Sequence, residues 1–109
     1  MDIDKFNRIS FLAEFGAYFE DDDRPIEEIF LTIEHFIMST QPRALHLWEA
    51  DINKIGTALE LCDDAELDYV LERNYGIYAH TVGGGRKFFQ SLHNRMLVAL
   101  KQKKSQTDP

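Results

Sequence analysis

The chain has 109 residues, of which 44% are hydrophobic and 12% aromatic, so it is long enough for one hydrophobic core but not for two. Its single cysteine, Cys62, excludes an internal disulfide and a cysteine-based metal site, and we expect a small buried side chain there. The net charge of −7 is divided unevenly along the chain. Residues 1–72 hold 18 of the 19 acidic residues against 5 lysines and arginines, whereas residues 73–109 hold 7 basic residues against Asp108. This acidic majority disfavours nucleic-acid binding and favours association with a cationic surface.

The beginning of the chain, Met1 to Lys5, lacks the basic start and apolar run of a signal peptide. No apolar run approaches the roughly 18 residues that a membrane span needs. We therefore expect a cytosolic protein without a membrane partner.

The first predicted helix runs from about Asp4 to Phe19 and carries aromatic residues at helical spacing. Gly16 interrupts this aromatic face, and a glycine inside a helix costs about 1 kcal/mol relative to alanine. We expect another backbone or a bulky ring to pack against it. Four acids, Glu20 to Asp23, follow at the helix end that the helix dipole makes unfavourable for anions. Asp22 or Asp23 is expected to cap the next helix, but a cap needs only one of the four acids.

The second and third helices have the clearest periodicity. The second begins at Pro25 and ends near Ser39, because Pro42 disfavours helical geometry in the residue before it. The third spans about Arg43 to Leu61, with apolar residues that alternate steps of three and four. Asp51 lies beside this apolar stripe, and we expect it to be hydrogen-bonded at the edge of the core.

The last third of the chain predicts two more helices. A short helix from Ala65 to about Arg73 is expected to be capped by Asp63 or Asp64, and the final helix runs from about Arg86 to Lys103. No convincing strand is predicted. The sequence thus indicates an all-α protein, a single compact bundle of about five helices over residues 1–102, with a disordered tail over residues 103–109.

The segment from Tyr75 to Gly85 is the one long irregular stretch, and it ends in three glycines. Glycines before a helix suggest an anion site at its N-terminus, but no phosphate-binding pattern and no preceding strand accompany them here. A flexible turn that lets the final helix fold back is the favoured interpretation.

Catalytic and metal-binding patterns are absent. The four histidines form no pair at metal-ligand spacing, and only His80 lies in a loop. The acidic runs resemble exposed turns rather than two carboxyls held in a cleft, and they lack the spacing of a calcium loop. We expect no enzyme activity, no cofactor and no metal ion.

The arrangement of these segments resembles the small helical CdiI immunity proteins of contact-dependent growth inhibition systems. The resemblance covers roughly residues 9–100. It is carried by a series of short motifs in the family's order: Gly16-Ala17-Tyr18-Phe19-Glu20-Asp21-Asp22, Pro25-Ile26-Glu27-Glu28, Asp51-Ile52-x-x-Ile55, Asp64-Ala65-Glu66-Leu67, Gly76-Ile77-Tyr78 and Phe88-Phe89-x-x-Leu92. The first of these motifs is the most specific.

The resemblance implies an immunity protein that binds and neutralises the C-terminal toxin domain of a CdiA-type effector. Such toxins are often nucleases, with an RNase or tRNase favoured, and a nuclease must present lysines and arginines that an acidic surface can occupy. The acids expected at the interface are Glu20, Asp21, Asp22, Asp23, Glu27 and Glu28, followed by Asp63, Asp64, Glu66 and Asp68, of which the second set could instead cap a helix. The expected aromatic anchors are Tyr18, Tyr75 and Tyr78, for each of which a core or loop-packing role is equally open.

Two other interpretations stay open. The protein could be a helical adaptor or regulatory domain that binds an endogenous basic protein through the same acidic face. The basic residues of the final helix could instead touch nucleic acid or pair with acids of the same chain; these residues are Arg86, Lys87, Arg95, Lys101, Lys103 and Lys104. The oligomeric state is not predicted.

Overall fold

The computed structural model describes residues 3–19 and 23–107. Within these residues the chain is helical and forms no strand, so the predicted all-α bundle of about five helices is confirmed. The α-helices and the short 3-10 helices are, in order, α1 (Ile3–Phe15), η1 (Gly16–Tyr18), α2 (Ile26–Ser39), η2 (Pro42–Ala44), α3 (Leu45–Leu61), α4 (Asp64–Asn74), η3 (Ala79–Val82) and α5 (Gly85–Thr107).

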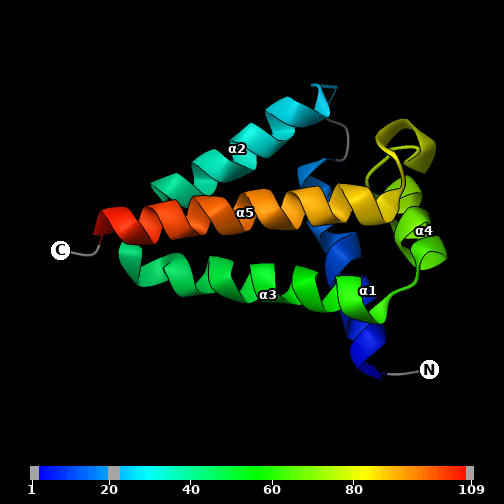
Figure 1. The fold of residues 1–109 in the computed structure, drawn as a ribbon, viewed down its shortest axis with the longest axis horizontal. Helices are drawn as coiled ribbons and strands as arrows, with labels where there is room; N and C mark the ends of the chain where they lie inside the picture. Colours follow the sequence, from blue (N-terminus) through cyan, green and yellow to red (C-terminus); the bar gives the residue numbers. More distant parts are fainter. Residues whose placement is uncertain (1–2, 20–22, 108–109) are drawn as a thin grey trace.

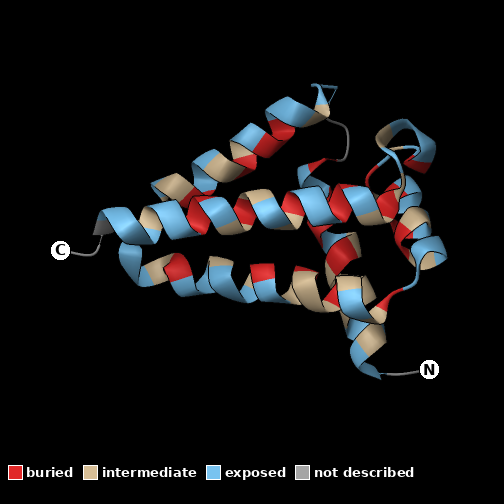
Figure 2. Cartoon of the chain, viewed as in Figure 1, coloured by how far each residue is buried: buried red, intermediate tan, exposed pale blue. Residues whose placement is uncertain are grey.

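Helix α5 is the centre of the arrangement (Figure 1). Helices α2 and α3 pack along it on opposite sides, and α4 packs near its N-terminal end. Helix α1 crosses behind α3 and α5 in this view and packs on α3 and α4. Since α2 and α3 make little contact with each other, α5 supplies the apolar surface that joins them. Figure 2 shows this as buried bands that recur along α5.

Aromatic rings fill the end of the core where α2, α4 and α5 meet. Phe19 lies 5.5 Å from Phe88 and 5.2 Å from Tyr75, measured between ring centroids. Phe30 lies 5.5 Å from Phe88, and Phe89 lies 5.2 Å from both Tyr75 and Phe88. Three of these five pairs are edge-to-face, a geometry that stabilises aromatic contacts beyond their buried area, and the other two are tilted.

The first helix differs from the prediction, because its α-helical part ends at Phe15 and η1 continues it only to Tyr18. Gly16 lies at this change and packs directly against α4. A Cβ atom on Gly16 would lie 2.5 Å from the carbonyl oxygen of Asn74 and 3.2 Å from the Tyr75 ring. The prediction that a backbone or ring packs on Gly16 is therefore confirmed.

The start of helix α2 corrects the predicted cap. Its N-cap residue is Pro25, and no side chain accepts a hydrogen bond there. The proposed cap by Asp23 is wrong, since Asp23 lies two residues before the N-cap, and Asp22 lies outside the described residues. The Pro25 carbonyl instead accepts hydrogen bonds from the amides of Glu28 and Ile29, at 2.9 and 3.3 Å.

The start of helix α4 follows the prediction. The Asp63 carboxylate accepts the Glu66 amide at 2.8 Å, while the Glu66 carboxylate accepts the Asp63 amide at 2.9 Å. This reciprocal pair is a capping box, which satisfies two backbone donors that the helix itself leaves open.

The final helix continues to Thr107, four residues beyond the predicted end at Lys103. The predicted end of the final helix is therefore corrected to Thr107. An ion pair stabilises this last part of the helix, because the Lys104 ammonium lies 2.5 Å from the Glu49 carboxylate on α3. None of the described helices combines the length and the apolarity that a membrane span requires.

Candidate protein-interaction surface

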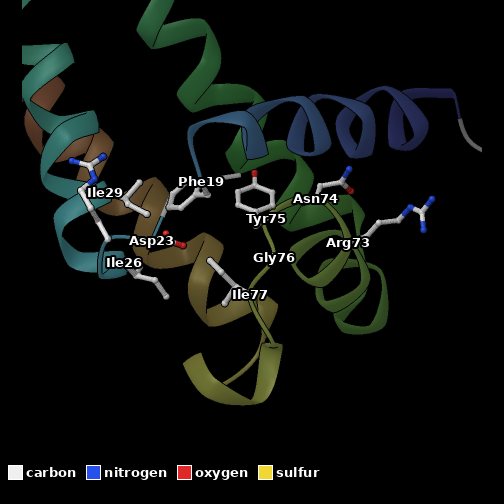
Figure 3. Close-up of a pocket in the computed structure, with 10 residues that line it drawn as sticks. Phe19, Asp23, Ile26, Ile29, Arg73, Asn74, Tyr75, Gly76 and Ile77 are labelled. Carbon is white, nitrogen blue, oxygen red and sulfur yellow. The ribbon is translucent and has the colours of Figure 1, made fainter. Parts of the chain in front are cut away.

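A pocket of about 360 Å³ opens between two connections that are far apart in sequence (Figure 3). One connection leads from η1 to α2, and the other leads from α4 to η3. Phe19, Ile29 and Tyr75 form a buried apolar floor, and Ile26 and Ile77 stand half-buried at its sides. The pocket is therefore a small apolar socket at the N-terminal end of α2.

The rim of this socket is polar and mixed in charge. It consists of Asp23, Arg24, Arg73, Asn74 and Gly76. The Arg24 guanidinium donates to the Thr32 hydroxyl at 2.9 Å, so it is drawn back along α2. The Arg73 side chain extends away from Asp23 (Figure 3), and its guanidinium lies 5.9 Å from the Tyr69 ring centroid. Asp23 is exposed and forms no hydrogen bond or ion pair within the described residues.

The first set of predicted acids surrounds this socket only in part. Glu20, Asp21 and Asp22 lie outside the described residues. Glu27 is exposed but pairs with Arg95 of α5 at 2.6 Å. The Glu28 carboxylate is exposed and, like that of Asp23, has no partner within the described part of the chain.

The second set of predicted acids is used by the fold. Besides the Asp63–Glu66 capping box, Glu66 pairs with Lys5 of α1 at 2.7 Å. The hydrogen bonds to the Asp63 amide and to Lys5 hold the pKa of Glu66 below its ordinary value. Asp64 pairs with Arg86, and the Asp68 carboxylate accepts the Gly85 amide at 2.6 Å. Of the two roles left open for these acids, the structure thus shows the one that holds helices together.

The Gly83–Gly85 turn is bound by an acid of the same chain, Asp68, at the start of α5. Gly83 and Gly84 have positive φ angles of 81° and 106°, a region that side chains with a Cβ avoid. Gly85 then begins α5, and the Asp68 carboxylate takes the position that a bound anion would occupy at a helix N-terminus.

The three predicted tyrosine anchors lie in three different environments. Tyr75 is only 2% exposed, and its hydroxyl points toward α1 and donates to the Leu12 carbonyl at 2.6 Å (Figure 3). Burial raises the pKa of Tyr75 far above its ordinary value, so it is a core residue rather than an anchor at the rim. Tyr78 is 68% exposed beside His80, and Tyr18 is 39% exposed beside Phe36, so these two remain accessible.

Several basic residues of α5 pair with acids of the same chain, as one interpretation of its charge predicted. Arg95 bridges Glu27 and Glu34 of α2 while its guanidinium lies 5.2 Å from the Phe30 ring centroid. Arg86 and Lys104 pair with Asp64 and Glu49.

Asp51 is half-buried on α3 and accepts no hydrogen bond within the described residues, so the predicted hydrogen bond is wrong. Burial raises the pKa of this carboxyl, against a smaller opposing effect of Lys54. The folded state therefore holds the Asp51 proton more strongly than the unfolded state does, and stability falls as the pH rises through the raised pKa.

Asp51→Asn is consequently expected to raise the free energy of unfolding at pH 7, and the gain is expected to shrink as the pH falls below the raised pKa. Urea unfolding of both proteins, at several pH values from about 4 to about 7, measures the difference. A gain that is constant across this range, or a loss at pH 7, contradicts burial as the cause.

Metal-ligating side chains do not converge in the described part of the chain. No group of three or more histidine, cysteine, aspartate or glutamate side chains there has the geometry to bind a metal ion. Cys62 is buried, as predicted, and burial raises the pKa of its thiol. A thiol of raised pKa is a poor nucleophile.

Sequence reasoning missed Arg24, Arg73, Asn74 and Ile77 as lining residues of the socket. Gly76 is a sequence signal that could have located this side of the socket, because a glycine just after a helix favours the left-handed turn that it forms here, with a φ of 69°. Comparison of the chain with models of known families, with curated proteins and with solved structures finds no match.

Proposed function

We propose that this protein is a cytosolic immunity protein of the CdiI type, which binds and neutralises the toxin domain of a contact-dependent growth inhibition effector. The surface proposed for the toxin is the socket and the start of α2. The toxin chemistry that fits is a basic nuclease, with an RNase or tRNase favoured.

The observation that supports this proposal is the contrast between the two acidic sets. All four acids of the second set are engaged by their own chain. Asp23, at the rim of the socket, and Glu28, in the first turn of α2, have no partner within the described residues. Exposed carboxylates beside an apolar socket combine attraction for a basic partner with a place for one of its apolar side chains.

Neutralisation follows from the chemistry of such a partner. A nuclease concentrates lysines and arginines where phosphates bind, so an acidic protein is steered toward that site and competes with the nucleic acid. The association is expected to weaken with salt because the attracting charges are solvent-exposed.

The test is calorimetric titration with the toxin domain encoded immediately upstream, at about 50 and about 300 mM salt. Asp23→Asn and Glu28→Gln are each expected to weaken binding about two- to fivefold at the lower salt, and less at the higher. Glu60→Gln removes an equal charge from an exposed position of α3 without a partner in the described residues, and it serves as the matched control.

Each outcome discriminates between the candidate functions. Binding that weakens in the two variants but not in the control supports the proposal. Tight binding that neither the two variants nor salt weakens is consistent with the immunity role but places the interface on another face. No binding, or no upstream toxin gene, contradicts the immunity role and favours an adaptor for an endogenous basic protein.

A further inference from the structure

A row of aromatic side chains crosses the surface where α1, η1 and α2 meet. The rings of Phe11 and Phe15 lie 6.0 Å apart, those of Phe15 and Tyr18 lie 4.8 Å apart, and those of Tyr18 and Phe36 lie 6.3 Å apart. Both Tyr18 and Phe36 are well exposed, at 39% and 44%. The row therefore starts at α1, where Phe15 is in the core, and ends on an open face of α2.

Two side chains of helix α3 contact the residues near the two ends of this row. The Trp48 indole donates to the Thr40 hydroxyl at 2.8 Å, at the end of α2. The Lys54 ammonium lies 5.2 Å from the Phe11 ring centroid. Asp51 is three residues from both Trp48 and Lys54 and so lies between them on the same flank of the helix. We call Phe11, Tyr18, Phe36 and Trp48 the aromatic frame.

The core side chains of the two helices that carry Phe36 and Trp48 are closed to solvent, since Ile33 and Ile37 of α2 and Ile55 of α3 are at most 1% exposed. A partner must lie flat on such a face. Planar groups that stack on aromatic rings fit it better than a bulky side chain that needs a deep pocket.

Two carboxylates on the helices that carry the frame lack partners within the described residues. Asp51 lies on α3 midway between Trp48 and Lys54, and Glu14 lies on α1, three residues after Phe11. Lys54 does not neutralise Asp51 by an ion pair, because its ammonium is held over Phe11. Burial without a hydrogen-bond donor destabilises the ionised form of Asp51, and this effect raises the pKa of its carboxyl.

The chain itself shows which side chain suits this combination. On the other flank of α2, Arg95 lies over the Phe30 ring at 5.2 Å and pairs with Glu27 and Glu34. A guanidinium stacks on an aromatic face and donates to a carboxylate at the same time, which an ammonium does less well. The frame offers both features to a partner from outside.

We propose that the aromatic frame is a docking surface for an arginine side chain of a protein partner. The guanidinium stacks on Phe36 and Tyr18 and pairs with Asp51. This inference rests on the proposed function, because the protein partner that supplies the arginine is the same basic toxin. Tyr18 directly precedes Phe19, which lines the socket, so the frame and the socket share neighbouring residues of the chain.

The first test uses a hexa-arginine peptide, with hexa-lysine as the comparison, at low salt. Trp48 is the only tryptophan of the chain, so its fluorescence reports on the frame. Hexa-arginine is expected to shift this fluorescence at lower concentration than hexa-lysine. Asp51→Asn is expected to weaken binding about tenfold and Phe36→Leu about threefold. Asp51→Asn keeps the shape of the side chain, and Phe36→Leu keeps an apolar side chain while removing the aromatic ring.

The controls are Glu60→Gln, for the charge, and Leu31→Ala, for an exposed apolar residue of α2 that is 52% exposed and lies outside the frame. Neither is expected to change the affinity more than twofold. Binding that is equal for the two peptides, or that Asp51→Asn and Phe36→Leu leave within twofold, overturns the proposal.

The same variants in the toxin titration separate this inference from the proposed function. Toxin binding that Asp23→Asn weakens and Asp51→Asn does not overturns the frame as a docking surface and keeps the immunity role. Absence of toxin binding together with arginine-selective binding at the frame rejects the immunity role and supports the frame.

Discussion

Gly85→Ala is expected to lower the free energy of unfolding by about 3 kcal/mol, and the midpoint of thermal unfolding by about 10–15 °C. A Cβ atom on Gly85 would lie 2.6 Å from the Leu67 carbonyl carbon, 2.7 Å from the Leu67 oxygen and 2.8 Å from the Asp68 nitrogen. These are backbone atoms of α4, so no side-chain rotation relieves the overlap. Moving the helices apart would also lengthen the hydrogen bond from the Gly85 amide to Asp68.

Gly56→Ala is the matched control, because the change is identical and the neighbour differs. The nearest atoms to a Cβ atom on Gly56 would belong to the half-buried ring of His93, at 3.0 Å, and this side chain can shift by a few tenths of an ångström. Gly56 lies within helix α3, where alanine is favoured over glycine by about 1 kcal/mol. Thermal unfolding followed by circular dichroism measures both variants. Similar midpoints for the two would contradict close packing of α5 on α4.

The parts of the fold that sequence reasoning predicted correctly depend on local periodicity. The apolar stripe of α2 predicted its buried face well, because Ile29, Phe30, Ile33 and Ile37 are all buried. The Asp63 cap was predictable for the same reason, since its partner Glu66 is three residues away. Gly16 was informative because a glycine in an aromatic helix face has few explanations other than close packing.

The parts that could not be predicted depend on contacts between distant segments. Tyr75 was a possible anchor by sequence, but it is a core residue because its hydroxyl donates to the Leu12 carbonyl, 63 residues away. Acids of the second set pair with residues that are distant in sequence, such as Lys5 and Arg86, and no local pattern predicts these pairs. An acid near a helix start has the same sequence signature whether it caps, pairs or stays free.

The candidate socket is a stronger example. Its lining joins residues 19–29 with residues 73–77, and neither segment alone contains a recognisable site. The aromatic frame likewise draws on three helices and η1. Surplus charge along the sequence predicts a basic partner, whereas the position of the contacts with it depends on which acids the fold leaves without a partner.

Arg86→Met is expected to lower the free energy of unfolding by about 2–3 kcal/mol. The guanidinium joins three helices at one point. It donates to the Leu59 and Cys62 carbonyls at the end of α3, each at 2.7 Å, and to the Asp64 carboxylate at the start of α4, at 2.5 Å. These carbonyls belong to the last turn of α3, where the helix provides no donor and its dipole favours a cation.

Methionine keeps the apolar length of the side chain and removes all three donors, so the loss in urea unfolding reports the hydrogen bonds rather than packing. Lys87→Met, at the next and exposed position, is the control and is expected to change stability by less than about 0.5 kcal/mol. Arg86→Lys is expected to recover less than half of the loss, since one ammonium replaces a fork of donors that spans three acceptors. Equal stability of the lysine variant and the wild type would mean that charge alone, placed at the end of α3, holds α5 to its neighbours. That result would remove the geometric role of Arg86 and leave a dipole interaction that salt weakens, which repeating the titration at higher salt would reveal.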